Sequence, residues 1–397
     1  MATRIHKNWL KAFVDYAQYG EAPDSVYFWI AVSCVAACLR RRVWLPMGYF
    51  EWIPNFYVVI VAPPGIIGKS TSMGIGTKLL HQVPGIQFGP QVVTWQALVT
   101  SLAGSQEMID IPGEGMVSQS CLFIESSEFG NLLNPNDREM VDMLVHLWDG
   151  RKEQFLKKTK TSGDDTIINP CVNILAATTP DWIGGNFPEY LIGGGFTSRC
   201  IFVYAEEKAR LVAYPGLMMP EGYAAKEAGL IHDLEIISQL GGQYKLADKD
   251  AIAWGGEWYD KHNKEKHPHL DPGKFGGYLA RKQTHIHKLA MVLAAAQRDD
   301  LLITVDDLTF ADKAVTQLES DMAGIYAKIG TSADAKGQAE LVRIVRAFGV
   351  IDDKNLYSRL FKIMSHNEYV QAKDSAIAAG MISTKVINDQ YLISAIP

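Results

Sequence analysis

The sequence predicts an α/β protein whose core is a largely buried, parallel β-sheet. Unbroken apolar runs recur along the first half of the chain, which is typical of strands covered on both faces. Segments with helical periodicity lie between these runs. The clearest run, Tyr57 to Ala62, is followed at once by a Gly-rich turn and a helix. Because the carboxyl ends of parallel strands face the ligand crevice, polar residues that follow each run are the candidate site residues.

The composition limits the classes of protein to which this chain can belong. The 397 residues give room for two or three domains, and 48% hydrophobic with 21% charged residues is ordinary for a globular protein. The net charge of −6 provides no global basic field, so any nucleic-acid contact must come from local patches. Five scattered cysteines and no pattern of a secretion signal indicate a reducing cytoplasm and no membrane partner.

Two helices are expected in an N-terminal segment over residues 1–45. Residues 7–20 have amphipathic spacing and end at Gly20. The sequence Pro23-Asp24-Ser25 is a helix-start signal for the apolar run from Val26 to Leu39. That run is too short to span a bilayer, so a buried helix is predicted.

The run at Tyr57 to Ala62 introduces a P-loop, residues 63–71. Strand, loop and helix in this order place backbone N–H groups around a phosphate chain. Lys69 is expected to reach the outer phosphates and the Ser70 hydroxyl to ligate Mg²⁺, so ATP and Mg²⁺ are the predicted cofactors. Pro63 replaces the first glycine of the motif G-x-x-x-x-G-K-S. The residues expected to bind the nucleotide are Pro64, Gly65, Ile66, Ile67, Gly68, Lys69, Ser70 and Thr71.

An acidic strand end is expected after the P-loop. Residues 91–97 read as a second strand, and a helix begins near Gln96. The apolar run within 120–128 then ends in acids, which can hold the Mg²⁺ shell and polarise the attacking water. Glu128 suits the water-activating position, with Ser127 where a metal-shell Asp is usual. Glu125 directly follows the run and competes with Glu128, also as a metal ligand.

A basic hairpin is predicted downstream of a helix over residues 137–148. Residues 151–168 alternate and turn around Ser162-Gly163-Asp164. The first half of this hairpin concentrates cations in an otherwise acidic chain, either as a nucleic-acid contact or as a solvated charged surface. These cations are Arg151, Lys152, Lys157, Lys158 and Lys160.

Two further strands end or begin beside polar residues. The strand within 170–180 ends at Thr178 and Thr179, whose hydroxyls can bond a γ-phosphate or the attacking water. Arg199 directly precedes the apolar strand at 200–204. An arginine held there can reach the nucleotide of a neighbouring subunit and raise turnover by about a thousandfold or more. The alternative for Arg199 is an ordinary salt bridge.

The order of PPGIIGKS, LFIESSE, VNILAATTP and FTSRCIFV resembles the AAA+ ATPases of the MCM type and their phage and plasmid replication relatives. The resemblance covers residues 50–325 and implies an ATPase core over residues 46–215 with a helical lid over 216–330. It implies a hexameric ring that moves DNA through a pore, with Arg199 acting in trans and Thr179 as the phosphate sensor. Lys157, Lys158 and Lys160 fall on the family's DNA-tracking hairpin.

The predicted lid is helical. Helices are expected over residues 230–240, 251–262, 278–297 and 306–328. Arg281 and Lys288 lie seven residues apart on one face, a spacing of cations that the family has in its lid. The resemblance makes Arg281 the candidate contact to the γ-phosphate. The His-rich run at 262–269 matches no zinc spacing.

A winged-helix domain is predicted over residues 335–397, after a polar linker at 331–335. Helices are expected at 338–348, 353–364 and 368–379, and a hairpin at 381–394. If this domain binds DNA, its third helix enters the major groove. Cations are few there, chiefly Lys373, so regulation of the ring or docking of a partner is an equal alternative.

These features together predict an ATP-dependent DNA translocase or helicase of phage or mobile-element replication. It would act on single-stranded or forked DNA as an oligomeric ring, with any primase on another chain. One alternative is a nucleotide-switched scaffold or initiator ATPase without unwinding activity. A small-molecule kinase with a P-loop is the other.

Overall fold

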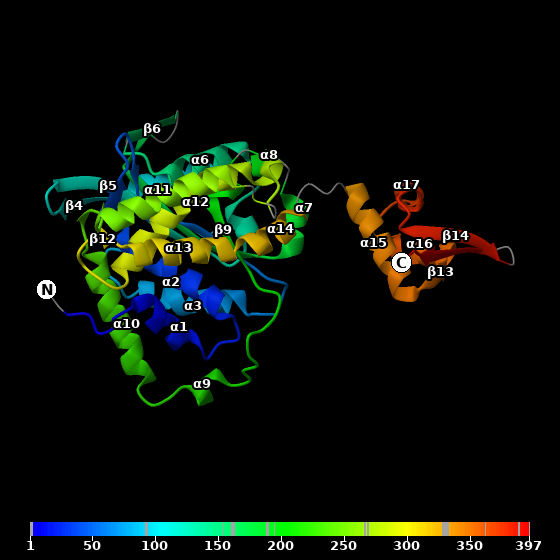
Figure 1. The fold of residues 1–397 in the computed structure, drawn as a ribbon, viewed down its shortest axis with the longest axis horizontal. Coiled ribbons are helices and arrows are strands. Elements are labelled where there is room, and N and C mark those ends of the chain that lie inside the picture. The colour runs from blue at the N-terminus through cyan, green and yellow to red at the C-terminus, as the bar shows by residue number, and fades with distance from the viewer. Residues whose placement is uncertain are drawn as a thin grey trace. The chain divides into compact units, whose positions relative to one another are not determined.

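The computed structural model describes residues 3–91, 94–152, 154–159, 163–187, 190–193, 195–265, 267, 270–327, 333–361, 363–387 and 390–396. The chain divides into two compact units, residues 1–326 and residues 327–397 (Figure 1). They are called the N-terminal unit and the C-terminal unit below.

A five-stranded sheet forms the centre of the N-terminal unit. Its order is β4-β5-β8-β3-β9, and only β4 is antiparallel to its neighbour. Every residue of β3 and β8 is buried, as the unbroken apolar runs predict. The α/β class with a mostly parallel sheet is therefore confirmed. The strands are β3 (Tyr57–Val61), β4 (Gln106–Ile111), β5 (Gly115–Ser126), β8 (Pro170–Thr178) and β9 (Cys200–Tyr204).

Helices cover both faces of this sheet. The hydroxyl of Tyr57 donates to Leu144 O in α6 (Arg138–Asp149), at 2.8 Å. Asn173 reaches Ala36 O in α2 (Asp24–Leu39), and its neighbour Ile174 is in register with Tyr57. Because successive side chains of a strand point to opposite faces, α2 and α6 lie on opposite sides of the sheet. The predicted buried helix is thus confirmed as α2.

The strand predicted at residues 91–97 is wrong from residue 95 onward. Helix α4 (Trp95–Gly104) begins there, and the Thr94 side chain caps it by accepting from Ala97 N–H at 3.3 Å. The place beside β5 is taken by residues 87–89, which exchange two backbone hydrogen bonds with Phe123. Residues 92–93 lie outside the described part of the chain.

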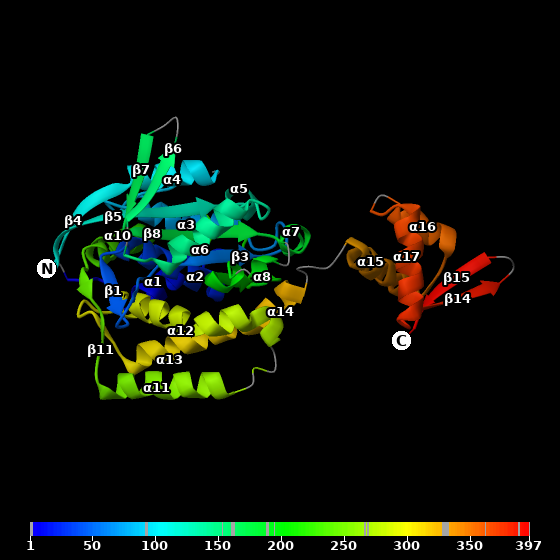
Figure 2. The same ribbon diagram turned by 90° about the horizontal axis from the view of Figure 1, so that it is seen from above.

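The remaining elements of the N-terminal unit are short strands and flanking helices. The predicted hairpin at 151–168 is confirmed as β6–β7, and the helix predicted at 306–328 is two helices, α13 and α14. In Figure 2, α11, α12 and α13 form a helical layer. The bounds are α1 (Trp9–Ala17), β1 (Val43–Pro46), β2 (Glu51–Trp52), α3 (Lys69–Leu80), α5 (Phe129–Leu132), β6 (Gln154–Thr159), β7 (Gly163–Ile168), α7 (Pro180–Asn186), α8 (Tyr190–Gly193), the 3-10 turn η1 (Thr197–Arg199), α9 (Pro215–Met218), α10 (Tyr223–Ser238), β10 (Gly242–Gln243), β11 (Lys245–Leu246), α11 (Lys249–Lys264), α12 (Pro272–Ala295), β12 (Leu302–Ile303), α13 (Val305–Gln317) and α14 (Glu319–Ala327).

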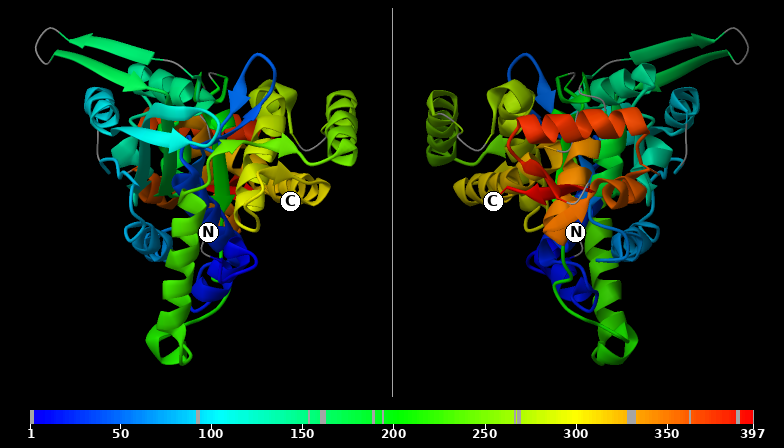
Figure 3. Two further views of the ribbon diagram at one scale, coloured as in Figure 1. Left: turned by 90° about the vertical axis from the view of Figure 1, so that its left-hand side faces the viewer. Right: turned by 90° about the vertical axis from the view of Figure 1, so that its right-hand side faces the viewer.

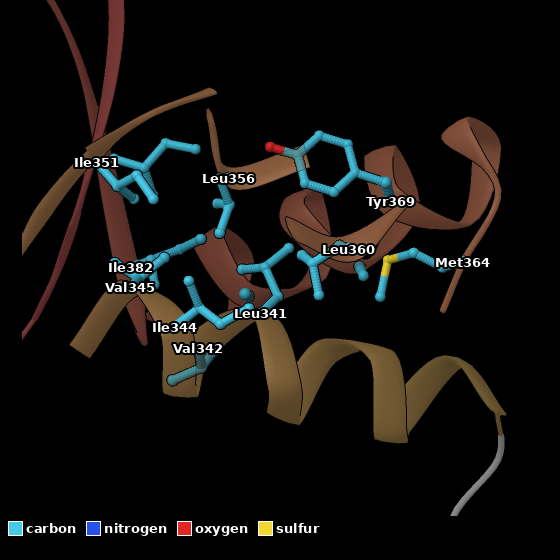
Figure 4. Close-up of a cluster of buried hydrophobic side chains, with 13 residues drawn as sticks. Leu341, Val342, Ile344, Val345, Ile351, Leu356, Leu360, Met364, Tyr369 and Ile382 are labelled. Carbon is cyan, nitrogen blue, oxygen red and sulfur yellow. The ribbon is translucent and has the colours of Figure 1, made fainter. Parts of the chain in front are cut away.

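In the part that the structure describes, the C-terminal unit has three helices and a three-stranded antiparallel sheet of order β13-β15-β14. Its helices and hairpin match those predicted, whereas β13 was not expected. Leu341, Leu356 and Leu360 are fully buried in its core (Figure 4). Burying them removes apolar surface from water and holds the three helices against the sheet. The elements are α15 (Ala333–Phe348), β13 (Val350–Asp352), α16 (Asp353–Leu360), α17 (His366–Ala378), β14 (Ile382–Ile387) and β15 (Gln390–Ala395).

Among the helices that the structure describes, none combines the length and the apolar character needed to cross a lipid bilayer.

Candidate functional site

Residues 63–71, predicted to be a P-loop and called by that name below, connect the carboxyl end of β3 to the first turn of α3. Gly65 and Gly68 take φ of +72° and +57°, in the left-handed region that glycine adopts without strain. A Cβ added at Gly65 would meet nothing within 4 Å, so the backbone conformation, and not lack of space, requires glycine there. Gly68 is the N-cap of α3, and its carbonyl accepts from Ser72 N–H at 2.9 Å.

The outer side of the P-loop faces solvent. Pro64, Gly65, Gly68, Ser70 and Thr71 are all exposed. The first turn of α3 reads Lys-Ser-Thr-Ser, so its side chains carry one positive charge and two exposed hydroxyls. The N-terminus of a helix presents N–H groups and the positive end of its dipole, and both favour an anion. The loop therefore fits a phosphate group.

Lys69 lies folded back over the P-loop. Its Nζ donates to Ala62 O at 2.6 Å and to Pro63 O at 3.3 Å. Partial burial lowers the pKa of Lys69 from its ordinary value. Both acceptors are neutral carbonyl oxygens, which do not neutralise the ammonium charge. An arriving phosphate would remove the cost of this partial burial by supplying the opposite charge.

The strand register separates the two candidate acids. Ser126 is opposite Ala176 on β8, and Thr178 is opposite Val61 on β3, so position 128, two residues beyond Ser126, is level with the last residue of β3. Glu128 is exposed there, as the N-cap residue of α5. The Ser126 hydroxyl donates to Glu128 O at 2.8 Å and fixes the turn after β5. The arrangement brings Glu128 to the carboxyl edge.

Glu125 lies short of that edge. Burial raises the pKa of its carboxyl, and a hydrogen bond with Thr77 opposes the rise. Thr77 is seven residues beyond Ser70 on α3, which is about 10 Å along a helix. Two ligands of one Mg²⁺ lie far closer together than this, since each is about 2 Å from the ion. The structure thus does not bring Glu125 and Ser70 together as the metal ligands that the sequence suggests.

The two threonines of β8 reach the same edge as Glu128. Thr178 ends the strand and is buried between β3 and β5. Thr179 is the N-cap of α7, where its hydroxyl oxygen accepts from Trp182 N–H at 3.1 Å. A hydroxyl that accepts through oxygen can still donate its proton. Thr179 therefore keeps a donor that can point to a ligand at this edge.

Arg199 lies at the other end of the sheet. Its Nε and Nη2 donate to Asp149 Oδ1 at 2.9 and 2.8 Å, and its Nη1 donates to Gly195 O at 2.9 Å. The guanidinium also stacks over Trp148, with 5.5 Å between its carbon and the ring centroid. Arg199 is thus buried in an ion pair of its own chain, although it still lines a cavity.

Arg281 lies beside Arg199 and not beside the P-loop. Burial, and next the charge of Arg199, lower the pKa of Arg281. Helix α12 carries Arg281 past the turn that precedes β9, whereas the P-loop follows the far end of β3. The parallel pairing of these five-residue strands separates the two places by roughly 15–20 Å. The predicted grouping of Arg281 with the P-loop of its own chain is therefore not found.

The two arginines line a cavity of about 880 Å³. Lys288 forms part of its wall, donating from Nζ to Asn55 Oδ1 at 2.6 Å and to Trp148 O at 3.0 Å. The ammonium is 3.6 Å from the centroid of the Trp148 ring. The spacing from Arg281 marked Lys288 in the sequence, but no sequence signal marked Asn55 or Trp148 as its partners.

Replacing Lys288 by methionine is expected to change the pH dependence of stability. Burial lowers the pKa of Lys288 from 10.5 to about 7, so between these values the unfolded chain binds more protons than the folded one. The free energy of unfolding of the wild type should therefore rise by about 2 kcal/mol more than that of Lys288→Met between pH 7 and 9. Denaturant unfolding at several pH values checks this. Parallel curves for the two proteins would show that Lys288 titrates normally.

For the strands of the basic hairpin, β6 and β7, the structure gives the pairing of the backbone. Lys157 on β6 is in register with Asp165 on β7, and Lys158 is in register with Asp164. This register fits the solvated alternative as well as a nucleic-acid contact. Lys160 lies outside the described residues.

Comparison of the sequence with models of known protein families and with curated protein sequences finds no match. The class of protein follows from the structure alone. It is a mixed α/β protein with a five-stranded, mostly parallel sheet flanked by helices.

Proposed function

We propose that the chain is an ATPase of the AAA+ type that translocates or unwinds DNA as an oligomeric ring. One observation carries the proposal: β8 lies between β3 and β5, so the P-loop, Thr179 and Glu128 meet at one edge of the sheet. Ligands of open α/β sheets bind at this carboxyl edge. The resemblance of the motif order to replicative helicases supplies the substrate class.

Each residue at this edge has a role in the proposed hydrolysis. The N–H groups of the P-loop and the Lys69 ammonium would hold the phosphates, and the Ser70 hydroxyl would be the protein ligand of the metal. ATP supplies the transferable phosphoryl group, and Mg²⁺ neutralises its charge. Glu128 accepts a proton from the attacking water, and the Thr179 hydroxyl donates a hydrogen bond to the water or the γ-phosphate. Ser127, where a metal-shell Asp is usual, would supply no carboxylate to the metal.

Arg199 and Arg281 suggest that the site is shared between copies of the chain. They lie together at the end of the sheet away from the P-loop of their own chain. In a head-to-tail assembly the arginine end of one copy meets the P-loop end of the next, and such contacts close into rings. The phosphate would then replace Asp149 as the partner of Arg199. A nucleotide at this interface would then be bound from both sides.

The main alternative is a scaffold that binds ATP and DNA without turnover. Steady-state and single-turnover measurements of ATP hydrolysis on single-stranded DNA separate the two. A motor is expected to hydrolyse many equivalents of ATP with DNA-dependent rates. Hydrolysis that stops after one equivalent per subunit would establish the scaffold and contradict the motor.

Changing Lys157, Lys158 and Lys160 together to alanine is expected to weaken DNA binding equally for all sequences. Loss of three phosphate contacts should reduce the slope of log affinity against log salt by about 2 on single strands. Oligonucleotide titrations at several salt concentrations measure both effects. The matched control removes the same charge from the exposed face of α11, as Lys249, Lys261 and Lys264 to alanine. Unchanged affinity of the hairpin variant would remove the hairpin from the mechanism.

The C-terminal unit supports protein docking better than DNA reading. Lys373 of its third helix is bonded to Asp353 Oδ1 at 2.6 Å. Exposed positions of α17 include Glu368 and Asp374, whose charges repel phosphates. We therefore assign this winged-helix-like unit to regulation or partner binding, and the DNA contact to the N-terminal unit.

A further inference from the structure

An exposed aromatic turn forms part of the wall of the cavity of about 880 Å³ that Arg199 and Arg281 also line. Residues 47–50 join β1 to β2, and Met47 N–H closes the turn by donating to Phe50 O at 2.8 Å. Gly48 takes φ +79° there, which favours glycine. Tyr49 at the tip is fully exposed and Phe50 is 56% exposed. Contact with a flat apolar ligand would gain the burial of both rings.

The base of this turn is packed against the helical layer. Phe50 contacts Trp52 with ring centroids 5.7 Å apart, and Trp52 contacts His287 of α12 at 5.0 Å. Trp52 is itself buried and in register with Leu45. The strand pair therefore holds the tip in place, and little ordering remains for a ligand of Tyr49 to impose.

The surroundings of the turn are positively charged. The residues that line this cavity include four cations, two carboxylates and Lys288, whose pKa is lowered to about 7 by burial. Both carboxylates are already in ion pairs, Glu51 with Arg41 and Asp149 with Arg199. Two of the cations, Arg151 and Lys152, are exposed at the same cavity, and Lys152 makes only a long, exposed ion pair with Glu114, at 3.6 Å. In a chain of net charge −6, this is a local basic surface.

We propose that Tyr49 and Phe50 stack on the bases of single-stranded nucleic acid while Arg151 and Lys152 bind its phosphates. This rests on the proposed function and names a second contact for its substrate. Aromatic faces accept any base and cations follow the backbone, so the combination binds single strands without reading sequence. Strand β6 begins two residues after Lys152, and both hairpins rise at the same end of the unit (Figure 3, left). One strand can thus reach both.

Affinity for two oligonucleotides tests the stacking contact. One is a fluorescent thymidine oligonucleotide, and the other has the same length and backbone but no bases. Tyr49→Ala is expected to bind the thymidine strand roughly five- to a hundredfold more weakly and the base-free strand as the wild type does. Tyr49→Trp should retain the wild-type affinity. The control Tyr214→Ala removes a tyrosine that is 71% exposed near α9, at the opposite end of the unit (Figure 1), and should change neither affinity.

Three outcomes would overturn the proposal. Equal affinities of Tyr49→Ala and wild type for the thymidine strand would remove the stacking contact. An equal loss on the base-free strand would show an effect that does not involve bases. A change of oligomeric size with unchanged affinity would make the turn a contact between copies of the chain. Failure of the proposed function looks different, because the wild type would then bind neither oligonucleotide.

Discussion

Replacing Lys69 by alanine is expected to lower ATP hydrolysis by at least about a hundredfold, because a preorganised cation at the transferred phosphoryl group is lost. The ammonium is already positioned at the P-loop, on Ala62 O and Pro63 O. Both contacts are made to neutral oxygens, so a bound phosphate would be the first negatively charged partner of the Lys69 ammonium in this loop. Steady-state hydrolysis in the presence of single-stranded DNA measures the effect.

The control for Lys69 lies on the same helix. Lys78 is an exposed lysine of α3, nine residues after Lys69. It pairs with Glu227 at 2.8 Å. Lys78→Ala removes the same charge and should leave hydrolysis intact. If Lys69→Ala retained DNA-stimulated hydrolysis while thermal unfolding remained unchanged, residues 63–71 would not be the phosphate-binding loop.

Replacing Arg199 by alanine is expected to leave ATP binding intact and to cut turnover by about a thousandfold. A guanidinium that meets the phosphoryl group in the transition state contributes to the rate and little to ground-state binding. Binding of a fluorescent nucleotide and steady-state hydrolysis give the two halves of this result. Arg281→Ala, which breaks only a bond to Gly277 O among the contacts described, is expected to act in the same direction.

Asp149→Asn separates this catalytic role from a structural one. In Arg199→Ala the Asp149 carboxylate, whose side chain is 29% exposed, loses its partner, and this destabilises the fold because the carboxylate is partly buried. Asp149→Asn weakens the same ion pair but keeps the guanidinium. A structural role predicts that both variants lose stability and activity together. Turnover preserved in Asp149→Asn and lost in folded Arg199→Ala is the result that the shared site requires.

Local sequence signals were sufficient for most of the sheet. Unbroken apolar runs identify β3 and β8 because strands buried on both faces cannot alternate. The strand predicted at 91–97 was wrong because Val92, Val93 and Trp95 are residue types that favour a strand. The only competing signal was a single helix-capping residue, Thr94. A cap of this kind is visible in the sequence only when the helix behind it is recognised.

The candidate site depends on register, which the sequence does not specify. Glu125 and Glu128 are both glutamates near the end of the same strand, so the sequence does not distinguish them. Only the pairing of β5 with β8 shows which one reaches the carboxyl edge. Arg281 was grouped with the P-loop because spacing along a helix says nothing about the end of the sheet that the helix crosses. Its place beside Arg199 is a tertiary contact that arises where α12 packs on η1.

Mixing Lys69→Ala with Arg199→Ala tests the shared site most directly. Each variant alone is expected to be inactive. In random mixed assemblies about one interface in four joins an intact P-loop of one copy to an intact Arg199 of the next, so hydrolysis should return to roughly that fraction of the wild type. A mixture that remains as inactive as its two components would contradict a nucleotide held between copies.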